Sequence, residues 1–283
     1  MNYEILTPLE RCALPDGVFA AAYDVVDEAD KAAFKRCIAA QYALFPPAES
    51  ARFEVVERRA GFATFRAAWP LDWVCILLPA TPVSPLKLLA ALLPARTSGA
   101  RAVAVVRPEH AVWEDGVLAA LELAGQEDVF AASPAVWKRQ CATLGKAGGA
   151  GLSMLLGTGN DAGEGLEPPS GGRLWLAPAS RSLGVFCENK EAFDLASLAR
   201  LHPDSTITAF GTPKRTKGVT CRAGSWEDFV GRDFDAAYVP AELLEEALSR
   251  FSLAFGTGGE AHWLWPGLTA ATFTHSRLGL KDG

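Results

Sequence analysis

Apolar residues between positions 74 and 125 form short unbroken runs that alternate with longer helical patterns. The runs at 74–78 and 102–106 predict buried strands, because they lack the polar alternation of a strand with one wet face. Residues 85–97 and 112–124 have the apolar spacing of helices, and Gly125 closes the second. The sequence therefore predicts a β-α-β-α series around a parallel sheet covered on both faces.

The same alternation continues up to a stretch rich in glycine and proline. Residues 129–130, 134–144 and 154–156 predict a further strand, helix and strand. The last of these leads into the turn Gly157-Thr158-Gly159-Asn160. Residues 161–172 contain many residues that favour loops, so we place a domain boundary there.

A second α/β series follows this boundary. Its predicted strands lie at 174–176, 183–186, 206–210, 218–221 and 236–239, and its predicted helices at 191–201, 226–230 and 241–251. The predicted fold class is thus α/β, with two Rossmann-like lobes, mostly parallel sheets and a cleft between the lobes. The first, cofactor-type lobe spans 73–170 and the second spans 171–283.

The N-terminal part of the chain, residues 1–72, does not follow this alternation. Residues 19–45 have helical apolar spacing that ends at Pro46-Pro47. Residues 53–57 and 62–66 resemble short strands joined around a glycine. We expect this segment of helix and strands to pack with the second lobe.

Composition narrows the classes of partner. The chain has 283 residues, of which 49% are hydrophobic, enough for two small domains. Lysine and arginine number 27 against 33 acidic residues, a net charge of −6 without a basic block, so no nucleic-acid partner is expected. The first residues do not resemble an export signal, and no apolar run approaches the ~20 residues of a membrane span. We expect a cytoplasmic protein with no membrane partner.

The six cysteines are scattered and never form a C-x-x-C pair, the spacing that metal and redox sites favour. Cys75, Cys187 and Cys221 lie in predicted strands. Buried, reduced thiols are the favoured interpretation, since cysteine behaves there as a small hydrophobe.

An ordered series of short motifs carries a resemblance to histidinol dehydrogenase. The motifs are residues 69–79 (WPLDWVCILLP), 92–103 (LLPARTSGARAV), 117–130 (VLAALELAGQEDVF), the Gly157–Asn160 turn, Pro203-Asp204-Ser205, Thr212-Pro213 and 276–280 (SRLGL). They occur in the same order as in that family and together extend over roughly residues 52–283. The resemblance implies NAD as cofactor, a catalytic zinc ion and a glutamate–histidine pair that moves protons.

The positions that this resemblance assigns to the metal are changed. Where the family has a Gln-Ala-Glu-His run, this chain has Leu198-Ala199-Arg200-Leu201, and leucine cannot coordinate zinc. His202 comes next, but its register matches a glycine of the family, so we interpret it as a solvated loop histidine. Zinc is therefore not expected, and no metal ligand is assigned.

Two residues remain as candidate catalytic groups through the resemblance. Asp235 falls near the family's proton-transfer pair, although an aspartate of ordinary pKa is a weak base at neutral pH. His262 matches the histidine of the family's Gly-Thr-Asn-His motif. The alternative for His262 is a half-buried histidine beside Trp263 and Trp265.

The resemblance also places a cofactor turn and a substrate segment. Gly157, Gly159 and Asn160 match the turn that contacts the nucleotide, where glycines let backbone amides approach a phosphate. Leu77 and Val136 stand where the family has a tyrosine and a glutamine that contact the cofactor, which predicts weaker binding. Ser180-Arg181-Ser182 matches the substrate-binding serine, and Arg181 favours an anionic ligand unless it is an ordinary surface arginine.

Three functions remain open. The first is a histidinol dehydrogenase-like protein, a pseudoenzyme, that has lost the zinc-dependent reaction and keeps a cleft for a small-molecule ligand or nucleotide. The second is an active NAD-dependent oxidoreductase with a different substrate and with Asp235 or His262 as base. The third is a non-catalytic interaction or regulatory protein, in which Trp263 and Trp265 contribute to a contact surface. The sequence leaves the oligomeric state open.

Overall fold

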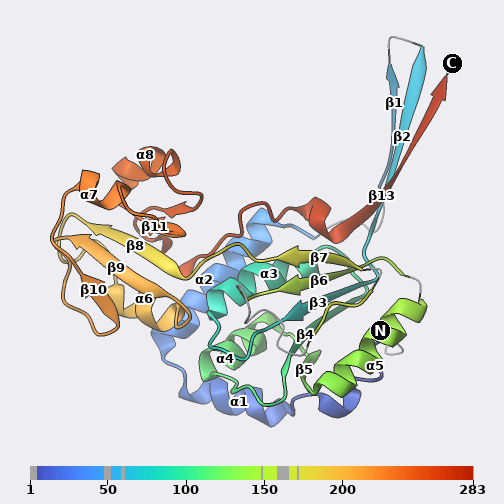
Figure 1. Cartoon of the computed structure of the whole chain (residues 1–283), viewed down its shortest axis with the longest axis horizontal. Coiled ribbons are helices and arrows are strands. Elements are labelled where there is room, and N and C mark those ends of the chain that lie inside the picture. Colours follow the sequence, from blue (N-terminus) through green and yellow to red (C-terminus); the bar gives the residue numbers. More distant parts are fainter. Residues whose placement is uncertain are drawn as a thin grey trace.

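A computed structural model describes residues 5–47, 52–58, 61–147, 149–157, 166–170 and 172–282. It contains two five-stranded parallel sheets and a three-stranded antiparallel sheet. Each parallel sheet forms its own lobe with helices, and the antiparallel sheet projects from the first lobe as a narrow arm (Figure 1). The predicted α/β class with two mostly parallel lobes is confirmed.

The first sheet has the strand order β5-β4-β3-β6-β7. Its strands are β3 (Trp73–Leu77), β4 (Ala102–Pro108), β5 (Val129–Ala132), β6 (Gly151–Leu155) and β7 (Arg173–Leu176), and its helices are α3 (Pro85–Thr97), α4 (Asp115–Ala124) and α5 (Pro134–Ala147). Helices on both faces leave β3, β4 and β6 buried along their whole length. This double burial is the reason that these strands appear in the sequence as unbroken apolar runs.

Neighbouring residues of β3 pack into two different cores. Val74 and Ile76 join the core formed with α3 and α4, whereas Cys75 and Leu77 join a core with Trp137 of α5. The two-residue period of a strand produces this division, because successive side chains point to opposite faces.

β7 lies at the edge of the first sheet, although the sequence placed residues 174–176 in the second lobe. It pairs in parallel with β6, with Leu152 opposite Arg173 and Leu155 opposite Leu176. The first sheet therefore extends to Leu176, beyond the boundary predicted at 170. A four-residue strand contains no local signal that selects one sheet over another.

The N-terminal helices rest mainly on the first lobe, whereas the sequence placed residues 1–72 against the second. α1 (Asp16–Val25) contacts α4, and α2 (Glu28–Leu44) contacts α3. α2 also touches the short helix η5 (Gly259–Ala261), which belongs to the C-terminal half. The helical pattern at 19–45 is two helices, since Asp27 caps a new helix by accepting a hydrogen bond from the Ala29 amide at 2.7 Å.

The second sheet has the strand order β10-β9-β8-β11-β12. Its strands are β8 (Ser182–Cys187), β9 (Thr206–Gly211), β10 (Val219–Cys221), β11 (Ala236–Tyr238) and β12 (Ala254–Phe255), and its helices are α6 (Leu195–Leu201), η4 (Ala241–Leu243), α7 (Trp226–Val230) and α8 (Leu244–Leu248). The helix predicted at 191–201 begins later because Asp194 caps it, accepting from the Ala196 and Ser197 amides. The helix predicted at 241–251 is divided into η4 and α8.

The arm is formed by strands far apart in the chain. β1 (Arg52–Arg58) and β2 (Phe62–Pro70) form a hairpin, and β13 (Thr274–Asp282) pairs antiparallel with β2 along its full length. The sequence predicted the hairpin but not β13. Several large apolar side chains of the arm are exposed, among them Phe53, Leu278 and Leu280.

One hydrophobic core joins the two lobes. It contains Leu88 and Val105 of the first lobe together with Leu198, Phe255 and Trp263 of the C-terminal half. Within the described part of the chain, no helix has the length and apolar character needed to cross a membrane.

Candidate functional site

The two lobes meet end to end. The strands of the first sheet point toward the second lobe, and β8 starts at the junction and runs away from it (Figure 1). The carboxyl ends of β3 and β6 therefore face the segments that lead into β8, β9 and β11. β3 and β6 are neighbours from which the chain proceeds in opposite directions across the sheet, and open α/β sheets bind ligands at such a point.

A small crevice of about 20 Å³ lies at this point. The segments after three strands of the first sheet form one wall, and residues from the second lobe form the other. Its described lining consists of Pro79, Thr81, Pro82, Val83, Lys87, Leu156, Gly157, Ala177, Ser180, Arg181, Asp204 and Trp265. A cavity of this size has room for about one water molecule.

Arg107 shapes the wall that follows β3. Its guanidinium group is fully buried and donates to the carbonyl oxygens of Pro79 at 2.9 Å and Thr81 at 2.8 Å. It also forms a bidentate ion pair with the Glu114 carboxylate, in which Nη1 lies 2.7 Å from Oε2 and Nη2 lies 3.1 Å from Oε1. A planar group with five donors suits this task, and it holds the loop in one conformation.

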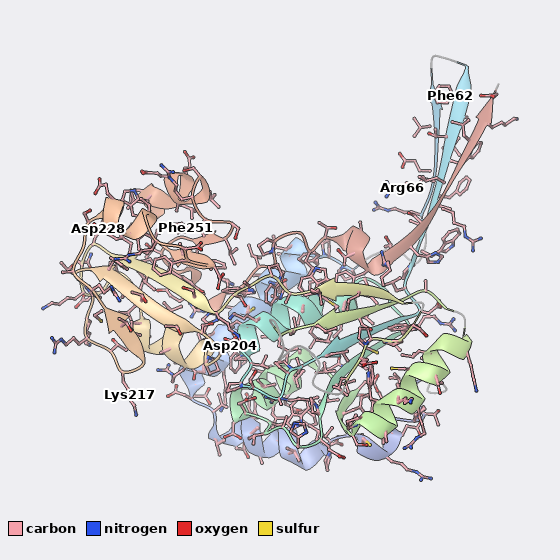
Figure 2. The ribbon with its side chains drawn as sticks, in the orientation of Figure 1. Phe62, Arg66, Asp204, Lys217, Asp228 and Phe251 are labelled. Atoms are coloured by element: carbon pink, nitrogen blue, oxygen red, sulfur yellow. The ribbon has the colours of Figure 1, made fainter. Side chains whose placement is uncertain are left out.

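Lys87, at the start of α3, connects the two lobes inside the junction. Its ammonium group donates to the Ser180 carbonyl oxygen at 2.6 Å, to Asp204 Oδ2 at 2.8 Å and to Ser205 Oγ at 2.7 Å. All three acceptors belong to the second lobe, and the Lys87 side chain is only 3% exposed. Three acceptors satisfy the three donors of an ammonium ion, so the contacts favour the charged form. Figure 2 shows Asp204 at this junction.

Two tryptophans complete the surroundings of Lys87. The Trp263 ring lies 4.9 Å from the ammonium nitrogen, in cation–π contact, and the Trp265 indole N–H donates to the Lys87 carbonyl oxygen at 3.0 Å. Burial lowers the pKa of Lys87, and the Asp204 carboxylate opposes that shift. The described lining of the crevice thus combines two cations, Lys87 and Arg181, with one carboxylate, that of Asp204.

His202 is a second buried connection between the lobes, and its interpretation as a solvated loop histidine was wrong. It is 1% exposed, with Nδ1 at 3.1 Å from Ser84 Oγ of the first lobe and Nε2 at 3.2 Å from the Tyr238 hydroxyl of the second. Burial, with the nearby charge of Lys87, lowers the pKa of His202 well below its ordinary value. The residue is therefore a neutral structural group.

The predicted substrate segment lies at the crevice. Ser180 and Arg181 line it, and the Ser180 carbonyl oxygen accepts from Lys87. The Arg181 side chain is exposed at the rim, while its carbonyl oxygen accepts from the Thr206 amide at 2.6 Å. Ser182 opens β8 and is not among the described lining residues. Of this segment, Arg181 supplies the exposed charged side chain at the rim of the crevice.

The two candidate catalytic residues do not come together at the crevice. Asp235 Oδ2 accepts from the Ser182 amide at 2.8 Å, an interaction that ties the start of β8 to the start of β11. His262 is half-buried, and burial and the charge of Arg36 lower its pKa. Neither residue is among the described residues that line the crevice.

The predicted cofactor turn is described only at its first residue. Gly157 follows β6 and lines the crevice, whereas Gly159 and Asn160 lie outside the described residues. Leu77, one of the two altered cofactor positions, is buried in the core beside β3, and Val136 is partly buried on α5.

The positions where the resemblance places polar zinc ligands are buried leucines. Leu198 and Leu201 lie on α6 with their side chains buried in the core that joins the lobes. Aliphatic side chains offer no electron pair to a cation. Among the described residues, no group of three or more histidine, cysteine, aspartate or glutamate side chains could hold a metal ion.

The remaining sequence candidates are packing residues. Trp263 and Trp265 are buried, so they do not supply an exposed contact surface. Cys75 and Cys187 are buried free thiols, as expected, and Cys221 is partly buried. Burial raises the pKa of Cys187 to about 11, which makes it a poor nucleophile at neutral pH.

A wider hollow of about 720 Å³ lies where the arm leaves the body. Trp69, Phe53 and Pro94 line it together with Arg66 and Glu54. Its described lining does not adjoin the junction of the lobes and includes no cluster of catalytic groups, so we assign the site to the much smaller crevice.

Comparisons with known proteins agree with this fold. No family of protein sequences matches the chain, and no curated protein matches it either. Among solved structures, it is similar to histidinol dehydrogenase from Elizabethkingia anophelis, with a TM-score of 0.56 and 12% identity over 97% of this chain and 78% of that one. It is also similar to a NAD-dependent benzaldehyde dehydrogenase from Corynebacterium glutamicum, with a TM-score of 0.50 and 12% identity over 94% of this chain and 83% of that one. The chain shares a dehydrogenase-like fold with these two proteins, although its sequence is only distantly similar to theirs.

Sequence reasoning missed the central residues of the junction. Lys87 lies in a predicted apolar helix, Asp204 and Ser205 in a short motif, and Tyr238 in a predicted strand, and none of these patterns by itself indicates a polar contact between the lobes. One signal was available, because Lys87 is the single charge between Pro85 and Pro94. A lone cation in an otherwise apolar helix indicates a buried partner.

Proposed function

We propose that this chain is a divergent relative of histidinol dehydrogenase that binds a small anionic ligand of nucleotide type and has lost the zinc-dependent oxidation. NAD is the first ligand to test. The observation that carries the proposal is the position of the crevice, between the carboxyl ends of β3 and β6 and with Arg181 and Lys87 on its lining. Parallel α/β sheets bind nucleotides at this point, and the exposed Arg181 at the rim favours an anionic group.

Two leucines of α6 support the loss of the zinc-dependent reaction. Leu198 and Leu201 stand where the resemblance places polar metal ligands, and both are packed in the core. Activation of an alcohol requires a Lewis acid or a base that reaches its hydroxyl group. The two candidate bases, Asp235 and His262, are not among the described residues at the crevice.

The crevice as it stands is too small for a dinucleotide. Its volume of about 20 Å³ matches a single water molecule. When bound, NAD would supply hydride acceptance, and Gly157 and Arg181 are the described residues that would meet it. Such binding requires the lobes to part around Lys87 and Asp204. The energy of that opening would weaken the measured affinity, because only the open fraction of the protein can bind.

A thermal-shift titration with oxidised and reduced NAD tests the proposal. A ligand present at one hundred times its dissociation constant adds about 2.7 kcal/mol of stability, which raises the melting temperature measurably. Arg181→Ala should reduce the shift, while Lys217→Ala, an exposed residue away from the crevice, should leave it unchanged. Absence of any shift with either form would contradict nucleotide binding.

Two further measurements address the lost reaction. Elemental analysis should find no stoichiometric zinc, and the protein should not oxidise histidinol in the presence of NAD. Turnover of histidinol at an enzymic rate would overturn the proposal. Turnover of another alcohol or aldehyde would instead favour the alternative, an active oxidoreductase with a different substrate.

A further inference from the structure

A second hollow lies at the opposite end of the second lobe, at the carboxyl edge of its sheet. Its volume is about 210 Å³, and its lining comes from the ends of β9 and β10 and from Lys190, just after β8. The lining residues are Lys190, Gly211, Thr212, Pro213, Arg215, Cys221, Arg222 and Ala223. The hollow is ten times larger than the crevice at the junction and shares no lining residue with it.

The charged side chains of this hollow all have the same sign. Lys190, Arg215 and Arg222 line it, and no carboxylate is among its described lining residues. In the described part of the chain, none of these three side chains donates a hydrogen bond or forms an ion pair. The whole chain carries a net charge of −6, so this cluster reverses the overall charge of the molecule.

The backbone at the floor of the hollow is held in place. Gly211 adopts φ +85°, and a Cβ atom there would lie 2.3 Å from the Cys187 carbonyl oxygen, so this turn requires glycine. The Thr212 amide donates to that same carbonyl oxygen at 2.9 Å, and the Thr212 hydroxyl donates to the Glu188 carbonyl oxygen at 2.8 Å. These hydrogen bonds join the ends of β8 and β9 at the hollow.

We propose that this hollow binds the phosphate group of a small phosphorylated molecule. Guanidinium and ammonium groups bind phosphate oxygens strongly, and arginine does so with paired hydrogen bonds. An anion would also relieve the mutual repulsion of Lys190, Arg215 and Arg222. The volume is about ten times that of the crevice, which has room for one water molecule, so the hollow can hold a phosphate with a short organic group. The carboxyl edge of a parallel sheet is also the edge at which α/β lobes bind ligands.

Calorimetric titration of the full chain with glycerol 3-phosphate and with inorganic phosphate tests this proposal. We expect saturable binding of at least one of them, with chloride at the same ionic strength as the control. Stronger binding of glycerol 3-phosphate indicates a phosphorylated metabolite, and equal binding indicates free phosphate. Arg215→Ala and Arg222→Ala should each weaken binding roughly tenfold, the loss of one strong charged contact.

Lys217→Ala is the matched control. Lys217 lies in the same β9–β10 connection, is exposed and is not among the described lining residues, and Figure 2 shows it at the edge of the second lobe, away from Asp204. Its removal changes the net charge by the same amount, yet binding should be retained. No saturable binding, or equal weakening by Lys217→Ala and Arg222→Ala, would overturn the proposal. So would binding of polyglutamate without binding of either phosphate compound, since that would indicate an acidic peptide partner.

Discussion

At the residue scale, the junction of the lobes depends on a few buried polar side chains. Lys87 reaches three oxygen atoms of the second lobe, and His202 is bonded on both ring nitrogens by Ser84 and Tyr238. Buried polar groups are tolerated only when their hydrogen bonds are made, and both residues meet that condition. Each is consequently more sensitive to substitution than its apolar neighbours.

Replacement of Lys87 by methionine should destabilise the protein by about 3 kcal/mol. Methionine fills a similar volume, but it removes the ammonium donor of the Asp204 carboxylate and the Ser180 carbonyl oxygen, and the single Ser205 hydroxyl proton can serve only one of these acceptors. Urea unfolding followed by tryptophan fluorescence would measure the loss. The control, Lys217→Met at an exposed position, should change the unfolding free energy by less than about 0.5 kcal/mol. Equal effects of the two variants would mean that the buried ion pair contributes nothing.

His202 should make stability fall as the pH is lowered. Its folded-state pKa lies well below that of the unfolded chain, about 6.5, because burial and the charge of Lys87 disfavour its protonation. The stability that neutral His202 contributes is fully present above pH 6.5. It is lost as the pH falls below that value toward the folded-state pKa, and the free energy of unfolding then decreases by up to about 1.4 kcal/mol per pH unit.

The variant His202→Gln, which cannot titrate, tests this contribution. Its unfolding free energy should change less between pH 7.5 and pH 5.5 than that of the natural sequence. His262 also has a lowered pKa and acts in the same direction, so some dependence should persist. Identical pH profiles for the two proteins would contradict the assignment.

At the scale of elements, the strands of the first sheet were predictable and their pairing was not. β3, and β4 from Ala102 to Val106, are apolar on both faces, and helices that cover both faces demand that pattern. β7 has three exposed residues out of four and could not be assigned to a sheet from its sequence. β13 is likewise mostly exposed, and its partner β2 lies about two hundred residues away.

Gly151 in β6 offers a test of how tightly this sheet is packed. A Cβ atom at Gly151 would lie 1.8 Å from the ring of Trp73, its partner on β3, and that ring is buried in the core. Gly151→Ala should therefore destabilise the protein by about 2–3 kcal/mol. Gly17→Ala in α1, where a Cβ atom meets no atom within 4 Å, should instead stabilise it by about 0.5 kcal/mol. Thermal melts of both variants measure these changes, and a change of the opposite sign in either variant would contradict the prediction.

At the scale of the whole molecule, the lobes share one core and a polar junction. Residues of α3 and α6 belong to a single hydrophobic cluster, and Lys87 and His202 join the lobes at its edge. The arm stands apart from this core, with Leu278 and Leu280 exposed. The two lobes are thus one unit in packing, although each has its own sheet.

We therefore expect the two lobes to unfold together. Differential scanning calorimetry should show one transition, with equal calorimetric and van't Hoff enthalpies. Two resolved transitions would indicate that the shared core contributes little. Lys87→Met should lower the temperature of the single transition without splitting it, because the apolar part of the junction remains.

The sequence by itself determined the two-lobed α/β class and its buried strands, since burial on both faces of a sheet leaves an unbroken apolar run in the chain. It also determined that Leu198 and Leu201 cannot bind a metal, because that follows from side-chain chemistry alone. It did not determine the short or exposed strands β12 and β13. Only the tertiary structure decided which polar groups meet. Lys87 and Asp204 are 117 residues apart in the sequence. The three cations of the hollow at the carboxyl edge of the second sheet, Lys190, Arg215 and Arg222, come from three separate connections of the second lobe. Contacts between residues so far apart in the sequence depend on strand order and on the packing of the lobes, which local sequence patterns do not encode.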